Sequence, residues 1–173
     1  MSTPLSRRSG GLALLASVAL LAGLAGPAAA DEPPDITFDF PAGIACADFD
    51  LRAEAWGLPK VYREFTDRDG TIARVLSAGR GSELLLTNMS TGATVWLRGN
   101  GFSATTRPNG DGTSTFTLTG HQVVFMYPTD HPAGPSTTWY VGRVAYHVVD
   151  ATQEYTLLEA AGRQTDICAA LSS

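Results

Sequence analysis

The sequence has few of the residues on which most enzyme and nucleic-acid sites depend. Its 173 residues include three histidines, two cysteines and 12 Lys and Arg residues, and Lys60 is the single lysine. The 17 acidic residues give a formal net charge of −5, and no basic stripe offsets them. An acidic surface repels polyanions, so we expect neither nucleic acid nor an anionic membrane surface as a partner.

The motifs of common catalytic and metal sites are missing as well. No Gly-x-Ser-x-Gly sequence marks a nucleophilic serine, and no His/Cys cluster has the spacing of a zinc site. Asp67-x-Asp69-Gly70 opens like a calcium loop, but its twelfth position is Ala78 instead of a bidentate glutamate. Asp-Gly and Asn-Gly pairs are also favoured in hairpin turns, which we predict here and at 109–112. We therefore assign no catalytic residue, metal ligand or cofactor.

No apolar run is long enough for a membrane span. Residues 12–24 (LALLASVALLAGL) follow Arg7 and Arg8 and end before the small residues 28–30. A span needs ~20 apolar residues, whereas this pattern is typical of a secretory signal peptide. We predict that residues 1–30 are removed, that 31–35 form a disordered leader, and that the protein is secreted. Loss of the two arginines changes the formal net charge from −5 to about −7.

The two cysteines, Cys46 and Cys168, lie near opposite ends of the mature chain. Exported chains meet oxidising conditions, so an even pair predicts one disulfide. Closing a loop of about 120 residues stabilises a fold by roughly 4–5 kcal/mol in the chain-entropy model. A catalytic or redox thiol pair would need Cys-x-x-Cys spacing or an activating histidine nearby, and the sequence has neither.

Short β-prone segments fill most of the remaining chain. Residues 82–127 contain five of them, separated by turn residues, which is typical of an antiparallel meander. In 113–119, Phe116 and Leu118 share one face and four threonines the other, which predicts a sheet with one buried face. The other predicted strands are 36–40, 49–56, 60–66, 72–76, 138–149 and 153–158. Gly142 predicts a bulge or a sharp bend.

Helix is expected only near the C-terminus. Residues 159–161 are predicted to start a helical turn that Gly162 stops, and 166–171 to form one short helix near Cys168. Nine or ten strands predict a single all-β domain over 36–173, either an antiparallel barrel-like structure or a sandwich, with a short C-terminal helix. The sequential connections favour the barrel-like form, and the bend at Gly142 also suits a sandwich.

Trp96, Trp139 and His131 are the candidate residues for a binding surface. The two tryptophans oppose the face assigned to the core, so exposed rings would form a recognition patch. If both sheet faces are covered, they are ordinary core residues. His131 follows Asp130 in the proline-rich loop 128–136, and this is the one pattern resembling a general-base pair.

Four segments together carry a family resemblance. They are Gly43-x-x-Cys46, Leu86-Thr-Asn-x-x-Thr-Gly92, the Asp-Gly turn at 111–112 and Asp166-Ile-Cys-Ala-Ala-Leu171. With the signal peptide, they make the chain similar to small, exported, β-rich, two-cysteine proteins of high-GC Gram-positive bacteria, which are uncharacterised. The resemblance implies a single domain and no catalytic residue.

These observations lead to three functional hypotheses. The first is a non-enzymatic, monomeric, exported domain that binds an extracellular protein, a glycan or another cell-surface component. The alternative is a β-barrel carrier of a small apolar ligand, in which Trp56, Tyr140 and Tyr146 would line an enclosed cavity of several hundred Å³. The third, which we favour least, is a hydrolase that uses Asp130 and His131.

Overall fold

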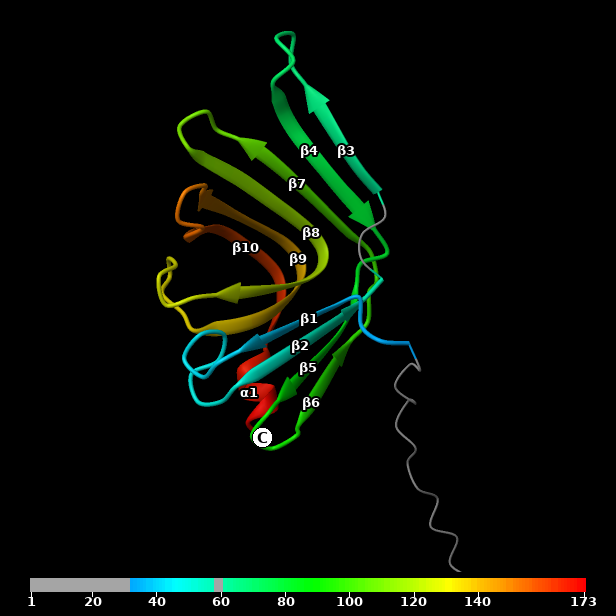
Figure 1. Cartoon of the computed structure of the whole chain (residues 1–173), viewed down its shortest axis with the longest axis vertical. Helices are drawn as coiled ribbons and strands as arrows, with labels where there is room; N and C mark the ends of the chain where they lie inside the picture. Colours follow the sequence, from blue (N-terminus) through cyan, green and yellow to red (C-terminus); the bar gives the residue numbers. More distant parts are fainter. Residues whose placement is uncertain (1–31, 58–60) are drawn as a thin grey trace, which may run out of the picture. The chain divides into compact units, whose positions relative to one another are not determined.

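The computed structural model describes residues 32–57 and 61–173, and their strands form two antiparallel sheets (Figure 1). The four-stranded sheet has the order β1-β2-β5-β6 and the six-stranded sheet the order β10-β9-β8-β7-β4-β3. The all-β prediction is confirmed. The described strands do not close into a barrel, so the architecture is a sandwich and not the barrel-like form that the connections favoured. The predicted signal peptide, residues 1–30, lies outside the described residues.

The element bounds follow the predicted segments closely. The four-stranded sheet comprises β1 (Ile36–Phe40), β2 (Leu51–Trp56), β5 (Glu83–Asn88) and β6 (Thr94–Leu97). The six-stranded sheet comprises β3 (Val61–Thr66), β4 (Ile72–Gly79), β7 (Phe102–Pro108), β8 (Thr113–Met126), β9 (Ser136–Val149) and β10 (Tyr155–Asp166). The predicted C-terminal helix is α1 (Ile167–Leu171), capped by the Asp166 carboxylate, which accepts a hydrogen bond from the Ala169 amide.

Residues 82–127, predicted as one meander, are divided between the two sheets. β5 and β6 belong to the four-stranded sheet, and β7 and β8 to the six-stranded one. β5 joins the first sheet because Leu84 and Leu86 pair with Ala55 and Ala53 of β2 on its buried face. The meander prediction is therefore wrong at the connection between β6 and β7.

The core of the sandwich follows from the alternation of the strands. In β2, Leu51, Ala53 and Ala55 are buried, while the residues between them are partly exposed. The core cluster combines both sheets and the helix: it contains buried Leu51, Leu86, Leu97, Ile167 and Leu171, and partly buried Val123, Phe125 and Trp139. Each fully buried leucine stabilises the fold by about 1.5–3 kcal/mol, so this cluster holds the two sheets together.

A disulfide joins the segment before β2 to the C-terminal helix α1. Cys46 and Cys168 are bonded, with a Cα–Cα distance of 5.6 Å and a sequence separation of 122, which confirms the predicted pair. Next to it, the buried Thr137 hydroxyl at the start of β9 donates a hydrogen bond of 2.9 Å to the Ala45 carbonyl. The segment before β2 is thus fixed to both α1 and β9.

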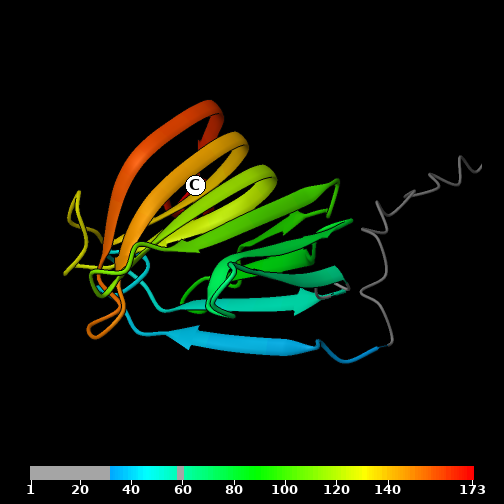
Figure 2. The same ribbon diagram turned by 90° about the horizontal axis from the view of Figure 1, so that it is seen from above.

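Three glycines form a row across the long strands. Gly120 of β8 pairs with Gly142 of β9, which pairs with Gly162 of β10. We call these three residues the glycine row. A Cβ on any of them would overlap a backbone carbonyl oxygen of the adjoining chain segment, and Gly120 has a φ of 102° that side chains disfavour. Only glycine therefore permits the sharp curvature of β8, β9 and β10 in Figure 2, where β1 and β2 are nearly straight.

The bend is so sharp that the six-stranded sheet folds back on itself. Tyr155 pairs with Val148, which pairs with Ser114. Ser114 is twelve residues from Met126 along β8, a distance of about 40 Å in an extended strand. The rings of Tyr127 and Tyr155 are nevertheless only 6.2 Å apart. Each long strand thus has two halves, before and after the glycine row, that oppose each other.

Two further predictions are corrected by the glycine row. The segments 113–119 and 121–127, read as separate strands, form the single strand β8 because Gly120 bends it without ending it. The helical turn predicted at 159–161 is wrong, since β10 continues through Gly162 to Asp166. The sharp bend predicted at Gly142 is present.

Candidate functional site

The inner side of the fold carries a second apolar cluster. Its buried members are Leu118, Val124, Met126, Tyr140 and Val144. Leu118 and Val144 come from one half of the folded sheet, and Val124 and Met126 from the other. Phe116 and Leu118 lie on this face of β8 and the threonines on the opposite one, as predicted. The same face of β8 therefore packs against itself across the bend.

A chain of aromatic rings follows this inner side and continues onto β1. Successive ring centroids are 5.0–6.3 Å apart, and the pairs are Phe116–Tyr146, Tyr146–Tyr155, Tyr155–Tyr127, Tyr127–Phe40 and Phe40–Phe125. Such contacts stabilise by about 0.5–1.5 kcal/mol per pair beyond the area they bury. The rings also provide a rigid, apolar wall.

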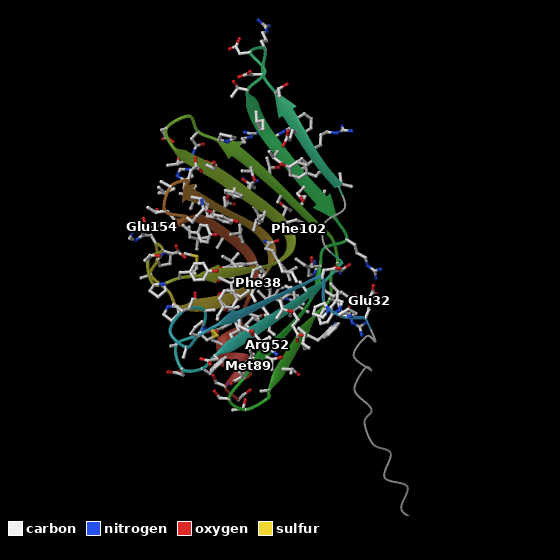
Figure 3. The ribbon with its side chains drawn as sticks, viewed as in Figure 1. Glu32, Phe38, Arg52, Met89, Phe102 and Glu154 are labelled. Atoms are coloured by element: carbon white, nitrogen blue, oxygen red, sulfur yellow. A yellow bond between two sulfur atoms is a disulfide. The ribbon has the colours of Figure 1, made fainter. Side chains whose placement is uncertain are left out.

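Two adjoining hollows lie against this wall. Their volumes are about 330 Å³ and about 120 Å³. They adjoin because both are lined by Leu118, Val123, Phe125 and Tyr146. The larger one continues to Phe102, Gly81 and Ser82, and the smaller one to Met126, Tyr127 and Tyr155. We call the two hollows together the aromatic cleft. In Figure 3, Phe102 lies on the right of the folded sheet, opposite Glu154 on the left.

Two polar side chains in the larger hollow have atoms without a hydrogen-bond partner among the described residues. These atoms are Nε2 and Oε1 of Gln122 and Nδ1 of His121. Gln122 has an exposed fraction of only 6%. Buried polar groups are almost always paired, and these atoms are exceptions that the surrounding protein covers, so they are not open to the hollow.

The tyrosine hydroxyls of the cleft are neutral. Burial raises the pKa of Tyr146 to about 12, and the neighbouring Tyr155 adds to this effect. Burial also raises the pKa of Tyr127 and of Tyr155, with a smaller contribution from the Asp130 charge in each case. The three phenols therefore act as uncharged hydrogen-bonding groups at neutral pH.

The raised pKa of Tyr146 predicts a loss of stability at high pH. Folding favours its neutral form, so its contribution is complete below the unfolded-state pKa of about 10 and is lost as the pH rises toward 12. We expect the free energy of unfolding to fall by about 2 kcal/mol across this range. Chemical denaturation at a series of pH values measures it. An identical profile in Tyr146→Phe would contradict the assignment.

Asp130 fixes two residues of the smaller hollow, Tyr127 and Tyr155, through their backbones. The residue is 1% exposed, and its carboxylate accepts hydrogen bonds from the amides of Tyr127 (2.5 Å) and Tyr155 (2.8 Å). The next residue, His131, forms a parallel bridge with Thr156 of β10. The loop 127–135, which we call the Asp130 loop, connects β8 to β9 along the chain. Its hydrogen bonds also attach it to the start of β10.

This arrangement gives the predicted Asp130–His131 pair a structural role. Both carboxylate oxygens of Asp130 hold backbone amides. His131 is bonded through its backbone: its amide donates to the Tyr155 carbonyl at 2.8 Å, and its carbonyl accepts from the Leu157 amide at 2.7 Å. The general-base hypothesis gains no support from these contacts.

Replacement of Asp130 by alanine is expected to lower the free energy of unfolding by about 3 kcal/mol, because two backbone amides lose a charged acceptor. His131→Ala is the matched control, since its backbone hydrogen bonds remain, and we expect a change within about 0.5 kcal/mol. Urea denaturation of both variants measures the difference. Equal effects of the two substitutions would contradict the structural role of the carboxylate.

Two of the three tryptophans, Trp56 and Trp96, share one surface, and Trp139 lies on the other sheet. Trp96 pairs with Leu85 and stacks on Trp56 at 5.3 Å, on the face of the four-stranded sheet that points away from the core. Trp139 packs against the core, with the His121 ring at 5.9 Å and the Arg163 guanidinium at 5.3 Å from its ring. Trp96, His121 and Trp139 are among the residues that line a further hollow of about 420 Å³.

Two of the three sequence candidates, Trp96 and Trp139, therefore line the same hollow, and His131 does not line it. His131 lies in the Asp130 loop, away from the surface shared by Trp96 and Trp56. Of the residues that the carrier hypothesis named, Tyr146 lines the aromatic cleft, Tyr140 is buried beneath it, and Trp56 is not part of it. Sequence reasoning missed Phe102, Gln122 and Tyr155. The sequence feature that could have indicated the cleft is the glycine row, since Gly120, Gly142 and Gly162 each lie in the middle of a long β-segment.

In the two turns that resemble calcium loops, the aspartate carboxylates accept hydrogen bonds from residues of the same turn. The Asp67 carboxylate accepts from the amides of Asp69 (2.9 Å) and Thr71 (3.0 Å). At the second turn, the hydroxyl and amide of Thr113 lower the pKa of Asp111. Over 32–57 and 61–173, no three His, Cys, Asp or Glu side chains gather as a metal site would require. Within the same ranges, no helix has the length and apolar character to cross a membrane.

No protein-family model matches the chain, and no curated protein or solved structure is significantly similar to it. Its function is therefore argued from the geometry of the cleft.

Proposed function

We propose that this protein is an exported, non-catalytic domain that binds the apolar or aromatic part of a small molecule in the aromatic cleft. The observation that carries the proposal is the larger hollow of about 330 Å³, lined by Phe102, Leu118, Phe125 and Tyr146. Its volume lies in the range of small-molecule sites, which are typically apolar with a few polar groups.

Export is supported by two independent features. The Cys46–Cys168 disulfide indicates folding in an oxidising environment. The first thirty residues have the pattern of a secretory signal peptide. Secretion and the resemblance to exported proteins of high-GC Gram-positive bacteria stay predictions.

The geometry favours a small ligand over a glycan. Glycan sites commonly use exposed aromatic faces, whereas Trp139 has an arginine and a histidine close to its ring. Trp96 and Trp139 line a hollow of about 420 Å³, which Arg98 and Asn100 also line, so its rim is more polar than the wall of the aromatic cleft. The aromatic cleft combines two adjoining hollows with a wall of aromatic rings. It differs from the predicted carrier in that the site is a cleft in a folded sheet and not a barrel interior.

Toluene is a suitable first probe, because it fills apolar space without hydrogen bonding. We expect saturable binding to the oxidised protein with a Kd on the order of 1 mM, in line with the limits for small ligands. Methyl resonances of Leu118 and Met126, followed by NMR, would report the cleft. Those of Leu86 and Leu171, in the sandwich core, are the internal control.

Saturable shifts at Leu118 and Met126, with Leu86 and Leu171 unchanged, are the expected result. Tyr146→Ala should weaken binding several-fold by removing one wall, while Tyr62→Ala, an exposed tyrosine on β3, should not. Absence of any saturable shift, or equal shifts in both sets of methyls, would reject the cleft as the binding site.

A further inference from the structure

One edge of the four-stranded sheet is open along β6. This strand, Thr94–Leu97, is the last in the order β1-β2-β5-β6, so among the described residues it has a neighbouring strand, β5, on one side only. It forms the outer strand of this sheet in Figure 1. A free sheet edge presents backbone N–H and C=O groups that can pair with a further strand.

The register with β5 indicates which backbone groups of β6 face outwards. The Asn88 amide donates a hydrogen bond of 2.9 Å to the Ala93 carbonyl, directly before β6 begins. Because hydrogen-bonded and non-hydrogen-bonded pairs alternate in an antiparallel ladder, Val95 and Leu97 direct their N–H and C=O groups toward β5. Trp96 directs its N–H and C=O groups away from β5, toward the open edge.

A hollow of about 420 Å³ lies along this edge. Val95, Trp96 and Leu97 all line it, although successive side chains of a strand point to opposite faces of the sheet. A hollow over one face would be lined by alternate residues, so this one runs beside the edge of the strand. Trp139 of β9 and Ile167 of α1 also line it. The space is therefore bounded by a strand edge and by apolar side chains of other elements.

The rim of the hollow is positive on a protein that is negative overall. Arg98, directly after β6, lines the hollow, and the Arg163 guanidinium lies 5.3 Å from the centre of the Trp139 ring. The described residues that line the hollow include no aspartate or glutamate, whereas the whole chain has a formal net charge of −5. This local positive charge favours a partner with a negative group beside Arg98.

We propose that β6 binds an extended segment of a partner protein, which adds a fifth strand to the four-stranded sheet. The added strand is antiparallel, the commoner pairing. Its residue opposite Trp96 exchanges backbone hydrogen bonds with it, and the residues opposite Val95 and Leu97 place apolar side chains in the hollow. The residue opposite Arg98 is acidic. The partner segment therefore has the pattern acidic, apolar, any residue, apolar, and the proposal does not depend on the aromatic cleft.

The capped peptide acetyl-Glu-Val-Thr-Val-Thr-amide is the probe, because it has this pattern and consists mainly of β-prone residues. We expect saturable binding to the oxidised protein with a Kd on the order of 0.5 mM, since a short peptide loses conformational freedom when it binds. NMR titration of the β6 amide resonances gives the Kd. Replacement of the peptide's glutamate by glutamine should weaken binding about threefold.

Two variants of the protein test the charge contact. In Arg98→Gln, the glutamate peptide should lose its advantage over the glutamine peptide, because the cation that distinguishes them is absent. Arg107→Gln is the matched control, since Arg107 is exposed on β7 and does not line the hollow. It should keep the wild-type preference. A preference that survives Arg98→Gln would overturn the assigned register.

Hydrogen–deuterium exchange tests the backbone pairing itself. At about 90% saturation, the Trp96 amide should exchange about tenfold more slowly, because it exchanges from the free protein alone. The amides of Val95 and Leu97, which face β5, are the internal control and should change far less. N-methylation of the peptide's central threonine, whose N–H faces Trp96, should weaken binding about tenfold. N-methylation of its second valine, whose N–H faces away from β6, should have little effect.

The remaining outcomes overturn the proposal. Equal effects of the two N-methylations, or a Trp96 amide that the peptide does not slow, would mean that the segment binds without becoming a strand of the sheet. Absence of saturable binding rejects the site. A dimer of the protein alone in sedimentation, with the Trp96 amide already protected, would show that a second copy of this chain covers the edge instead of a partner protein.

Discussion

Replacement of Gly142 by alanine is expected to lower the free energy of unfolding by about 4 kcal/mol, within the range known for changes that force backbone strands apart. Gly142 is the central member of the glycine row. An added Cβ would overlap the Ala161 carbonyl oxygen and lie 2.9 Å from the Gly162 Cα. Both are backbone atoms, so relief requires β9 and β10 to separate at this row.

Gly112→Ala is the matched control for this substitution. Gly112 has a φ of 83° in a hairpin turn, and nothing lies within 4 Å of an added Cβ. Its replacement therefore has the cost of backbone conformation alone, about 1 kcal/mol. Urea denaturation of the two variants would isolate the effect of close strand approach. Similar losses in both variants would contradict the role of the glycine row in folding the sheet.

Removal of the disulfide by the double substitution Cys46→Ala/Cys168→Ala is expected to cost about 4 kcal/mol. The bond closes a loop of 122 residues, and a loop of this length carries a stabilisation of up to ~5 kcal/mol in the chain-entropy model. Cys46 is fully buried, so the substitution also leaves a small cavity beside Ala45.

Denaturation of the double variant beside the oxidised protein measures this loss. Reduction of the wild-type protein with a thiol is the control, because it removes the bond without changing the side-chain volume. We expect reduction to reproduce most of the loss. A change below about 1 kcal/mol in both cases would mean that the sheets are held by packing alone and that the disulfide has little influence on the fold.

Much of the fold could be predicted from local patterns. Alternation placed β1 and most of β2, and Asp-Gly and Asn-Gly pairs placed the hairpins between β3 and β4 and between β7 and β8. The disulfide could be predicted because the chain has two cysteines and a signal-peptide pattern that indicates an oxidising compartment. The division of strands between two sheets could not be predicted in this way. β4 pairs with β7, although β5 and β6, which lie between them in the sequence, belong to the other sheet. Such pairing depends on long-range packing.

The candidate site was harder to predict from the sequence than the fold was. Trp96, Trp139 and His131 were chosen as residue types that often form sites, yet their environments depend on which sheet face is covered. Of the cleft residues, Tyr146 and Tyr155 are neighbours on the paired strands β9 and β10, but Tyr127 meets Tyr155 only because the sheet folds at the glycine row. Along the chain they resemble ordinary strand positions. Gln122 likewise resembles an exposed residue until its burial is known.

The account depends on the folding of the six-stranded sheet back on itself, and NMR can test this directly. Cross-peaks through space between the ring protons of Tyr127 and Tyr155 require the two halves to meet, since an extended sheet would separate the rows that carry them by about 40 Å. We predict strong cross-peaks between these rings, whose centroids are 6.2 Å apart. Their absence, with normal cross-strand peaks along β8, β9 and β10, would contradict the folded sheet and the cleft within it.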